Sequence, residues 1–106
     1  MSPSLDMNAT GARCRLELYV AGDTLNSRRA AQNLKRLMED LIEPVTVTTV
    51  DVLKEPKLAF EQGIFVTPSL IARDGERMSL VIGDLSDQEL VVRSLEPLGL
   101  IANRRP

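Results

Sequence analysis

Histidine and tryptophan are absent from the sequence, and cysteine occurs once, as Cys14. Without histidine the chain cannot form the Ser-His or Cys-His pairs that activate a nucleophile, nor a histidine metal site. One thiol cannot form an internal disulfide or a cysteine-rich metal site. Aromatic residues make up 3% of the chain, so leucine, isoleucine, valine and alanine must fill most of the core. These absences exclude several common catalytic and metal-binding sites, and we expect no cofactor.

Strong net charge and long apolar runs are also missing. The net charge is −2, without the basic excess that nucleic-acid-binding domains usually carry. No run approaches the ~18 apolar residues of a membrane-spanning helix, and the N-terminus lacks the basic and apolar regions of a signal peptide. We expect a cytoplasmic protein with no nucleic-acid or membrane partner. It should comprise a flexible arm over residues 1–12, one domain over 13–101 and a frayed tail over 102–106.

Hydrophobic periodicity predicts a strand, a helix and a second strand in the first half of the chain. Residues 13–21 alternate between two faces, which indicates a strand. Apolar residues spaced three and four apart over 27–42 predict an amphipathic helix, with Thr24 as its N-cap and Pro44 at its end. Residues 45–52 are β-branched on both faces, so we expect a strand covered on both sides. The crossover of this βαβ unit should be right-handed.

The next segments predict a short helix and a hairpin. Pro56 opens a short helix over 57–62, because proline suits the first helical position. Two runs that contain apolar residues, 69–73 and 77–82, flank Asp74-Gly75, a pair of residues typical of hairpin turns.

The last helix carries the most explicit start signal. Ser86 and Glu89 have the spacing of a capping box, with Ser86 as N-cap and Glu89 at the third helical position. Leu90, Val91 and Leu95 should form its buried face. The resulting order, β-α-β-α-β-β-α, predicts a single-domain α/β fold with the thioredoxin arrangement.

Four stretches of the sequence resemble the KaiB family of bacterial clock proteins. They are L-Y-V-A-G-D-T-L-N-S (18–27), D-V-L-K-E-P-K-L-A (51–59), T-P-S-L (67–70) and I-G-D-L-S-D (82–87). The similarity extends over roughly residues 14–96. The second half also resembles thioredoxins, in which a cis-proline occupies the position of Pro68. The residues that we assign to structural motifs, including Glu89 of the capping box, are Gly22, Thr24, Ser27, Pro68, Gly83, Asp84, Ser86 and Glu89.

The resemblance implies a non-catalytic protein-binding module in circadian or stress-related timing. Its expected partner is a KaiC-type ATPase ring, with a SasA-like histidine kinase pathway as a related context. The family's homo-oligomers leave the oligomeric state open. The docking surface that the resemblance implies consists of Arg29, Val50, Asp51, Leu53, Lys54, Pro56, Leu58 and Ala59.

One departure from the family bears on the fold. Typical KaiB chains carry a proline-rich segment before I-G-D-L-S and an acidic C-terminal tail, whereas this chain has I-A-R-D-G-E-R-M-S-L (71–80) and ends in R-R-P. KaiB is a fold-switching family whose ground state rearranges the C-terminal half, and that ground state is the alternative fold here. The hairpin signal favours the thioredoxin-like form. We therefore predict that this form is more populated here than in a typical clock KaiB.

Two further hypotheses stay open. Thr24 and Ser27 stand where thioredoxins carry their two cysteines, so this junction cannot cycle through a disulfide. Cys14 is predicted to be a core residue, and the alternative is a redox protein that uses this single thiol. The other alternative is a KaiB paralogue with a different protein partner. Asp84, Asp87 and Glu89 could suggest a metal, but helix capping accounts for Glu89 and Asp87, so we expect no metal site.

Overall fold

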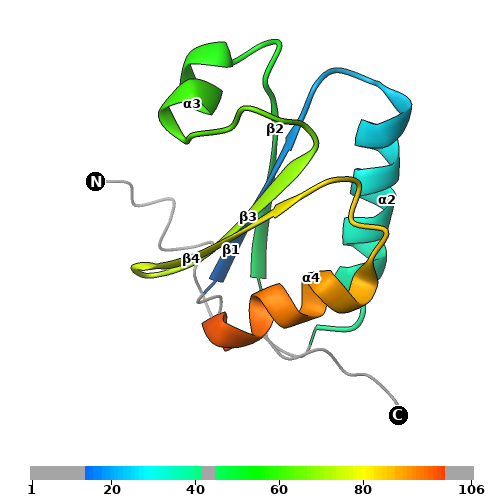
Figure 1. Cartoon of the computed structure of the whole chain (residues 1–106), viewed down its shortest axis with the longest axis vertical. Coiled ribbons are helices and arrows are strands. Elements are labelled where there is room, and N and C mark those ends of the chain that lie inside the picture. The colour runs from blue at the N-terminus through cyan, green and yellow to red at the C-terminus, as the bar shows by residue number, and fades with distance from the viewer. Residues whose placement is uncertain (1–13, 42–44, 100–106) are drawn as a thin grey trace.

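The computed structural model describes residues 14–41 and 45–99. Its elements follow the predicted order and end in a single 3₁₀ turn (Figure 1). The predicted arm, tail and helix end at Pro44 lie outside the described residues. The elements are β1 (Cys14–Val20), α2 (Leu25–Met38), β2 (Val45–Asp51), α3 (Pro56–Glu61), β3 (Ser69–Asp74), β4 (Arg77–Ile82), α4 (Gln88–Leu95) and η1 (Glu96–Leu98).

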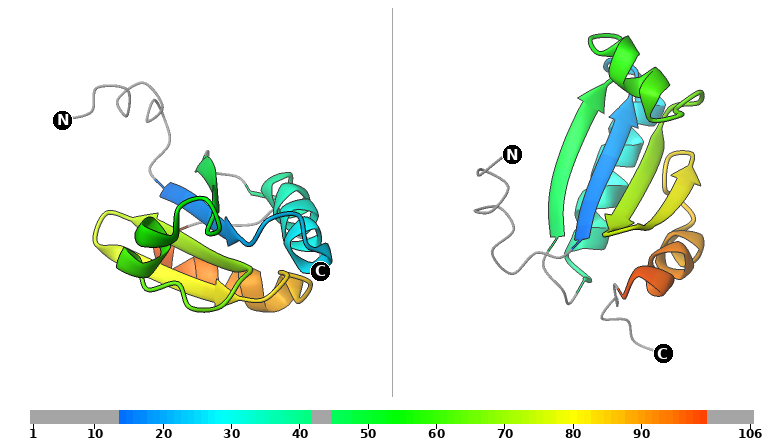
Figure 2. Two further views of the ribbon diagram at one scale, coloured as in Figure 1. Left: turned by 90° about the horizontal axis from the view of Figure 1, so that it is seen from above. Right: turned by 90° about the vertical axis from the view of Figure 1, so that its left-hand side faces the viewer.

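The four strands form one sheet in the order β2-β1-β3-β4 (Figure 2). β1 pairs in parallel with β2, so α2 is the crossover between two neighbouring parallel strands. β1 pairs antiparallel with β3, with Leu18 opposite Leu70. β3 then turns back into β4. The C-terminal ends of β1 and β2 therefore lie at the same end of the sheet.

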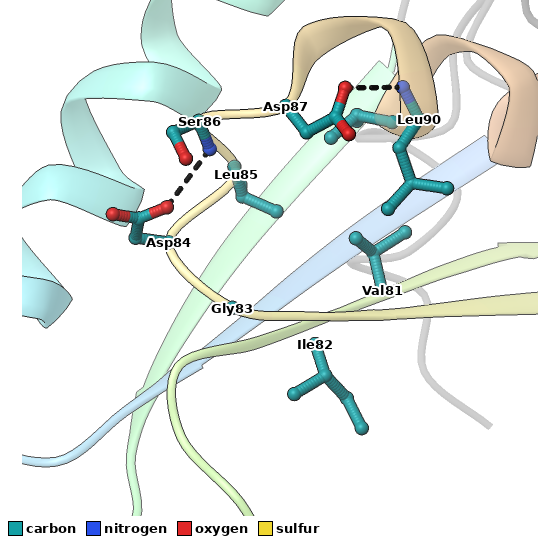
Figure 3. A pocket seen from close by; sticks show the side chains of 9 residues that line it. Val81, Ile82, Gly83, Asp84, Leu85, Ser86, Asp87 and Leu90 are labelled. Carbon is teal, nitrogen blue, oxygen red and sulfur yellow. Dashed lines mark hydrogen bonds between the residues drawn. The ribbon is translucent and has the colours of Figure 1, made fainter.

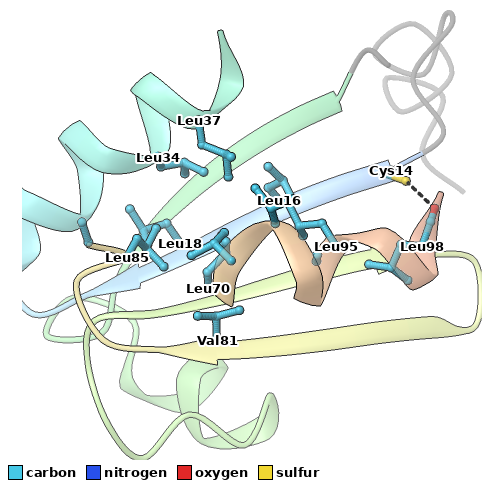
Figure 4. Packing of buried hydrophobic residues seen from close by; sticks show 14 of the residues in the cluster. Cys14, Leu16, Leu18, Leu34, Leu37, Leu70, Val81, Leu85, Leu95 and Leu98 are labelled. Carbon is cyan, nitrogen blue, oxygen red and sulfur yellow. Dashed lines mark hydrogen bonds between the residues drawn. The ribbon is translucent and has the colours of Figure 1, made fainter. Parts of the chain in front are cut away.

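The larger core lies between the sheet and helices α2 and α4, which cover the same face (Figure 4). The predicted alternation of β1 is confirmed, because its apolar residues at even positions all enter this core. Full burial of one such leucine stabilises the fold by about 1.5–3 kcal/mol. The core residues include Cys14, Leu16, Leu18, Ala30, Leu34, Leu37, Leu70, Val81, Leu85, Val91, Val92, Leu95 and Leu98.

A smaller cluster fills the space between α3 and the opposite face of the sheet. Tyr19, Val50 and Ile71 come from the strands, and Ala59 and Ile64 come from α3 and the loop that follows it. Pro56 occupies the start of α3, as predicted. The short helix is therefore fixed to the sheet by a few buried side chains.

Two predictions about the first half are wrong in detail. β2 is an edge strand, and Thr48 and Thr49 are exposed, so it is not covered on both sides. α2 runs from Leu25 to Met38 rather than over 27–42. Its earlier start follows from its cap, since a helix begins directly after an N-cap residue such as Thr24.

The hairpin is confirmed, and no helix spans its turn. Asp74 pairs with Arg77, so Gly75 and Glu76 form a two-residue loop. Gly75 has φ of 63°, the positive value that glycine adopts readily at the first position of a type II′ turn. The Thr67–Pro68 peptide bond is cis, as expected for the thioredoxin-like form.

Candidate partner-binding surface

The junction between β1 and α2 is held together by hydrogen bonds that start the helix. The Thr24 side chain accepts a hydrogen bond from the Ser27 backbone N–H at 3.2 Å, which confirms Thr24 as the N-cap. The Thr24 hydroxyl donates to Ser27 Oγ at 2.9 Å. Ser27 is buried, and its Oγ also accepts from the backbone N–H of Ala21 at 3.2 Å. Both hydroxyls at the positions of the thioredoxin cysteines are thus engaged in local structure.

Asp51 ties this junction to the loop before α3. Its Oδ1 accepts hydrogen bonds from the backbone N–H groups of Gly22 and Leu53, each at 3.0 Å. Gly22 has φ of 64°, and a Cβ at this position would lie 3.2 Å from Leu53 Cδ1. Glycine is therefore favoured chiefly by its backbone conformation, because the exposed Leu53 side chain could shift away from an added Cβ. The two loops at this end of the sheet are held as one unit.

The predicted docking residues divide into an exposed and a buried set. Leu53 is 70% exposed, and Lys54 and Pro56 are also exposed. Asp51 and Leu58 are partly buried. In contrast to the prediction, two of the set are interior residues: Val50 and Ala59 belong to the smaller cluster beneath α3. In this conformation they support the surface from below and are not accessible to a partner.

Sequence reasoning missed two exposed aromatic residues beside this set. Phe60 is 72% exposed and Phe65 is 80% exposed, and their rings form an edge-to-face pair with centroids 6.4 Å apart. The available signal was that the only two phenylalanines of the chain flank Gly63 closely. Exposed aromatic residues are enriched at protein interfaces. We define the α3 surface as Leu53, Lys54, Pro56, Phe60 and Phe65, all on α3 or the loops that flank it (Figure 1).

A polar network on the sheet holds the end of α3. Arg73 on β3 forms an ion pair with Glu17 on β1, with Nε 3.2 Å from Oε1, and donates a hydrogen bond to the side chain of Gln62. The Tyr19 hydroxyl donates to Glu17 Oε1 at 3.0 Å. Burial, and next the bond to the Glu17 carboxylate, raises the pKa of Tyr19 to about 12. An open cavity of about 390 Å³ lies over this network.

The G-D-L-S segment connects β4 with α2 and α4. The side-chain amide of Asn33 on α2 donates to the backbone oxygen of Asp84 at 2.7 Å. Asp84 Oδ1 accepts from the backbone N–H of Ser86 at 3.0 Å (Figure 3). Hydrogen bonds from Ser86 lower the pKa of Asp84, with a smaller contribution from the charge of Arg29. Arg29, the remaining predicted docking residue, is exposed on α2 and acts electrostatically on this segment.

The predicted capping box at α4 is wrong by one residue. Asp87 is the N-cap, and its Oδ1 accepts from the backbone N–H of Leu90 at 3.1 Å (Figure 3). Ser86 therefore precedes the cap, and Glu89 is the second helical residue rather than the third. Leu90 is exposed instead of buried. Val91 and Leu95 are buried as predicted, and Val92, which was not predicted to be buried, also lies in the core.

Two features of the described residues bear on metal and ligand binding. Within 14–41 and 45–99, no three cysteine or acidic side chains gather closely enough to hold a metal ion. The cavity beside Leu85 and Leu90 has a volume of about 80 Å³, smaller than the ~300–1,000 Å³ of typical ligand pockets, whereas the open cavity of about 390 Å³ over Glu17 and Arg73 lies within that range. No helix in the described part of the chain is long and apolar enough to cross a membrane.

Comparisons with known proteins were made on the sequence and on the fold. The model of the KaiB domain family matches residues 17–97. The circadian clock oscillator protein KaiB of Rippkaea orientalis is 45% identical over 84 residues, covering 78% of this chain and 81% of the relative. The circadian clock protein KaiB3 of Synechocystis is 38% identical over 99 residues, covering 91% of this chain and 93% of the relative.

Solved structures similar to this chain have the thioredoxin-like fold. A thioredoxin from Plasmodium falciparum superimposes with a TM-score of 0.70 at 15% identity, covering 96% of this chain and 84% of that protein. The N-terminal domain of SasA from Synechococcus elongatus superimposes with a TM-score of 0.65 at 23% identity, covering 81% of this chain and 86% of that domain. The predicted α/β thioredoxin-like fold is confirmed by this similarity.

Proposed function

The chain belongs to the KaiB family, and from this premise we propose that it is a non-catalytic, cytoplasmic module that docks on a KaiC-type ATPase ring. Its role would be in circadian or stress-related timing, and a SasA-like kinase pathway would be the related context. The observation that carries the proposal is the family match over residues 17–97, which contains the complete α3 surface.

The α3 surface has the chemistry of a docking site. Leu53, Phe60 and Phe65 each expose at least 70% of their surface, although apolar side chains gain free energy from burial. Exposed charges of both signs, Lys54 and Lys57 with Glu55 and Glu61, lie around them, which suits a partner rim of mixed charge. The two hydrogen bonds that Asp51 accepts, one from each loop, preorganise this end of the sheet. Less ordering of the loops would therefore be needed on binding.

The absence of catalysis is supported by the state of the candidate chemical groups. Thr24 and Ser27 hydrogen bond to each other at the junction where thioredoxins carry thiols. Cys14 is 1% exposed, and its thiol lies 3.7 Å from the backbone oxygen of Leu98. A redox thiol needs access to its substrate and positive neighbours that favour the thiolate. Burial of Cys14 therefore disfavours the single-thiol redox alternative.

Binding to the ring tests the proposal directly. The purified chain is mixed with a purified KaiC-type ATPase, incubated for hours and analysed by size-exclusion chromatography. We expect the two proteins to co-elute. Separate elution at every ratio and incubation time would contradict the proposal.

Surface variants then locate the site. Leu53→Asp and Phe65→Asp alter exposed side chains, so they should leave the fold intact and weaken binding to the ring at least tenfold. Leu90→Asp is the control, because Leu90 is an exposed apolar residue on α4, which covers the opposite face of the sheet from α3. Equal affinity for all three variants would show that docking uses another surface.

A KaiB paralogue with a different partner is the second candidate. It is favoured by the hairpin of β3 and β4, which lies where typical clock KaiB chains carry a proline-rich segment. The same hairpin bears on fold switching, because a change to the ground-state fold of the family would require the pairing of β3 with β4 to open. A chain that ignores the ring, and whose NMR spectrum has the sheet pairing of β3 with β4, would favour this second candidate.

A further inference from the structure

β4 forms an edge of the sheet with one side unpaired among the described strands. Its other side pairs with β3, with six residue pairs from Ser69–Ile82 to Asp74–Arg77 (Figure 2). A strand edge of this kind offers backbone N–H and C=O groups to another strand. Natural edge strands are usually protected by charged side chains, proline or a covering segment. The protection of β4 therefore decides whether this edge is a docking site.

Three large apolar side chains alternate along the same face of β4. Met78 is 53% exposed, Leu80 is 46% exposed and Ile82 is 56% exposed. The residues between them face α4: Val81 is buried in the larger core, and the Ser79 hydroxyl donates to the backbone oxygen of Ser94 at 2.7 Å. No proline or charged residue interrupts the strand after Arg77. The edge thus lacks the protection expected of a monomer.

The apolar stripe is complementary to itself in the antiparallel direction. If two β4 strands pair about a two-fold axis at Leu80, Leu80 lies opposite Leu80 of the second copy, and Met78 lies opposite Ile82. All three apolar residues of each copy then meet an apolar residue. Cross-strand apolar pairs are the main side-chain contribution to such a ladder. A parallel pairing has no two-fold axis across the ladder, so it would not close with two copies.

The charges at the two ends of β4 favour the same direction. The strand begins at Arg77, whose side chain is 63% exposed and pairs with Asp74 of its own hairpin at 3.1 Å. The strand ends close to the acidic residues Asp84 and Asp87. One acidic residue, Glu76, lies at the other end, in the hairpin loop before Arg77. Antiparallel pairing brings Arg77 of each copy toward the acidic end of the other, whereas parallel pairing would bring like ends together.

We propose that β4 is the interface of a two-fold symmetric dimer of this chain, formed by antiparallel pairing with Leu80 opposite Leu80. One six-residue strand is small compared with the ~800 Å² per partner of a standard stable interface. The dimer should therefore form reversibly and depend on protein concentration. The proposal does not rest on binding to the ATPase ring.

Cysteine cross-linking tests the register. Leu80→Cys places two thiols directly opposite each other, and the ~4.5–5.5 Å between paired Cα atoms lies within the range of disulfides. The native Cys14 is buried, so the new thiol is the reactive one. Under mild oxidation at micromolar concentration, we expect Leu80→Cys to form a covalent dimer at least ten times faster than Phe65→Cys, which is more exposed.

A mixed experiment distinguishes this register from any other. Met78→Cys and Ile82→Cys should cross-link to each other when mixed, and each should cross-link slowly alone. Rates for Leu80→Cys no faster than for Phe65→Cys would overturn the proposal. Fast self-linking of Met78→Cys would overturn the register.

Sedimentation equilibrium provides the second measurement. The wild-type chain should show a reversible monomer–dimer equilibrium, and Leu80→Lys should shift it at least tenfold toward monomer, because like charges would meet at the axis. Leu53→Lys is the control, since Leu53 is a more exposed leucine elsewhere. Circular dichroism checks that both variants are folded. A wild-type chain that is monomeric at every soluble concentration would overturn the proposal. The β4 edge would then be available to pair with a strand of another protein. Ring binding by Leu80→Lys would be unaffected in either case.

Discussion

The contact between Gly22 and Leu53 allows a precise test of how the α3 surface is positioned. Gly22 has φ of 64°, and this backbone conformation raises the energy of a residue with a Cβ by about 1–2 kcal/mol. Gly22→Ala also reduces the conformational freedom of the unfolded chain, which stabilises the fold by about 0.4–1 kcal/mol. The net expectation is a loss of about 1 kcal/mol in the free energy of unfolding.

The close contact should add little to this loss. An alanine Cβ would lie 3.2 Å from Leu53 Cδ1, so Leu53 must move by a few tenths of an ångström. Leu53 is 70% exposed and has room to do so. In a double-mutant cycle, the Gly22→Ala and Leu53→Ala changes should therefore couple by less than about 0.5 kcal/mol.

Gly75→Ala is the matched control for the backbone. Gly75 has φ of 63°, and no heavy atom lies within 4 Å of the added Cβ. Urea unfolding followed by far-UV circular dichroism measures all four variants and the wild type. If Gly22→Ala is more than about 1 kcal/mol worse than Gly75→Ala, and Leu53→Ala abolishes the difference, then Leu53 is rigidly held. That result would refute the inference that Leu53 has room to move away from an added Cβ at position 22.

Three other predictions concern the sheet and the last helix. Absorbance titration of Tyr19, the only tyrosine, should give a pKa of about 12, and Glu17→Gln should lower this pKa. The folded state holds the Tyr19 proton more tightly than the unfolded state does. The free energy of unfolding should therefore fall as the pH rises from about 10 to 12. Urea unfolding should show that Asp87→Ala loses about 1 kcal/mol, as for other N-caps, and that Ser86→Ala loses less. The same assay on Leu16→Ala, at a site with no exposed surface, should show a loss of about 2–5 kcal/mol.

Local signals in the sequence predicted the elements that depend on neighbouring residues. The alternation of β1, the Thr24 cap and the Asp74-Gly75 hairpin each involve residues within a few positions of one another. The structure confirms all three because local hydrogen bonding and side-chain direction determine them. The order of the elements then followed without any knowledge of which strands are neighbours.

The errors arose where the sequence pattern allowed more than one outcome. The β-branched composition of β2 suggested a buried strand, but its position at the edge depends on the pairing of β1 with β3. Ser86 and Asp87 are both good N-cap residues, and the turn that Asp84 forms with Ser86 leaves Asp87 to cap the helix. Phe60 and Phe65 are exposed although apolar side chains are usually buried, so reasoning from hydrophobicity alone would have placed them in the core.

In this thioredoxin-like fold, the proposed docking surface lies at the end of the sheet where thioredoxins carry their thiols. At that junction the Thr24 and Ser27 side chains are hydrogen-bonded to each other, and the Leu53 side chain lies close to Gly22. The junction is therefore occupied by its own side chains, and its contribution is to hold the loop that presents Leu53. The exposed apolar surface begins one loop further along, and continues to the aromatic pair after α3. The proposed docking at this surface would need rigid strand ends, and the two hydrogen bonds that Asp51 accepts hold both loops in place.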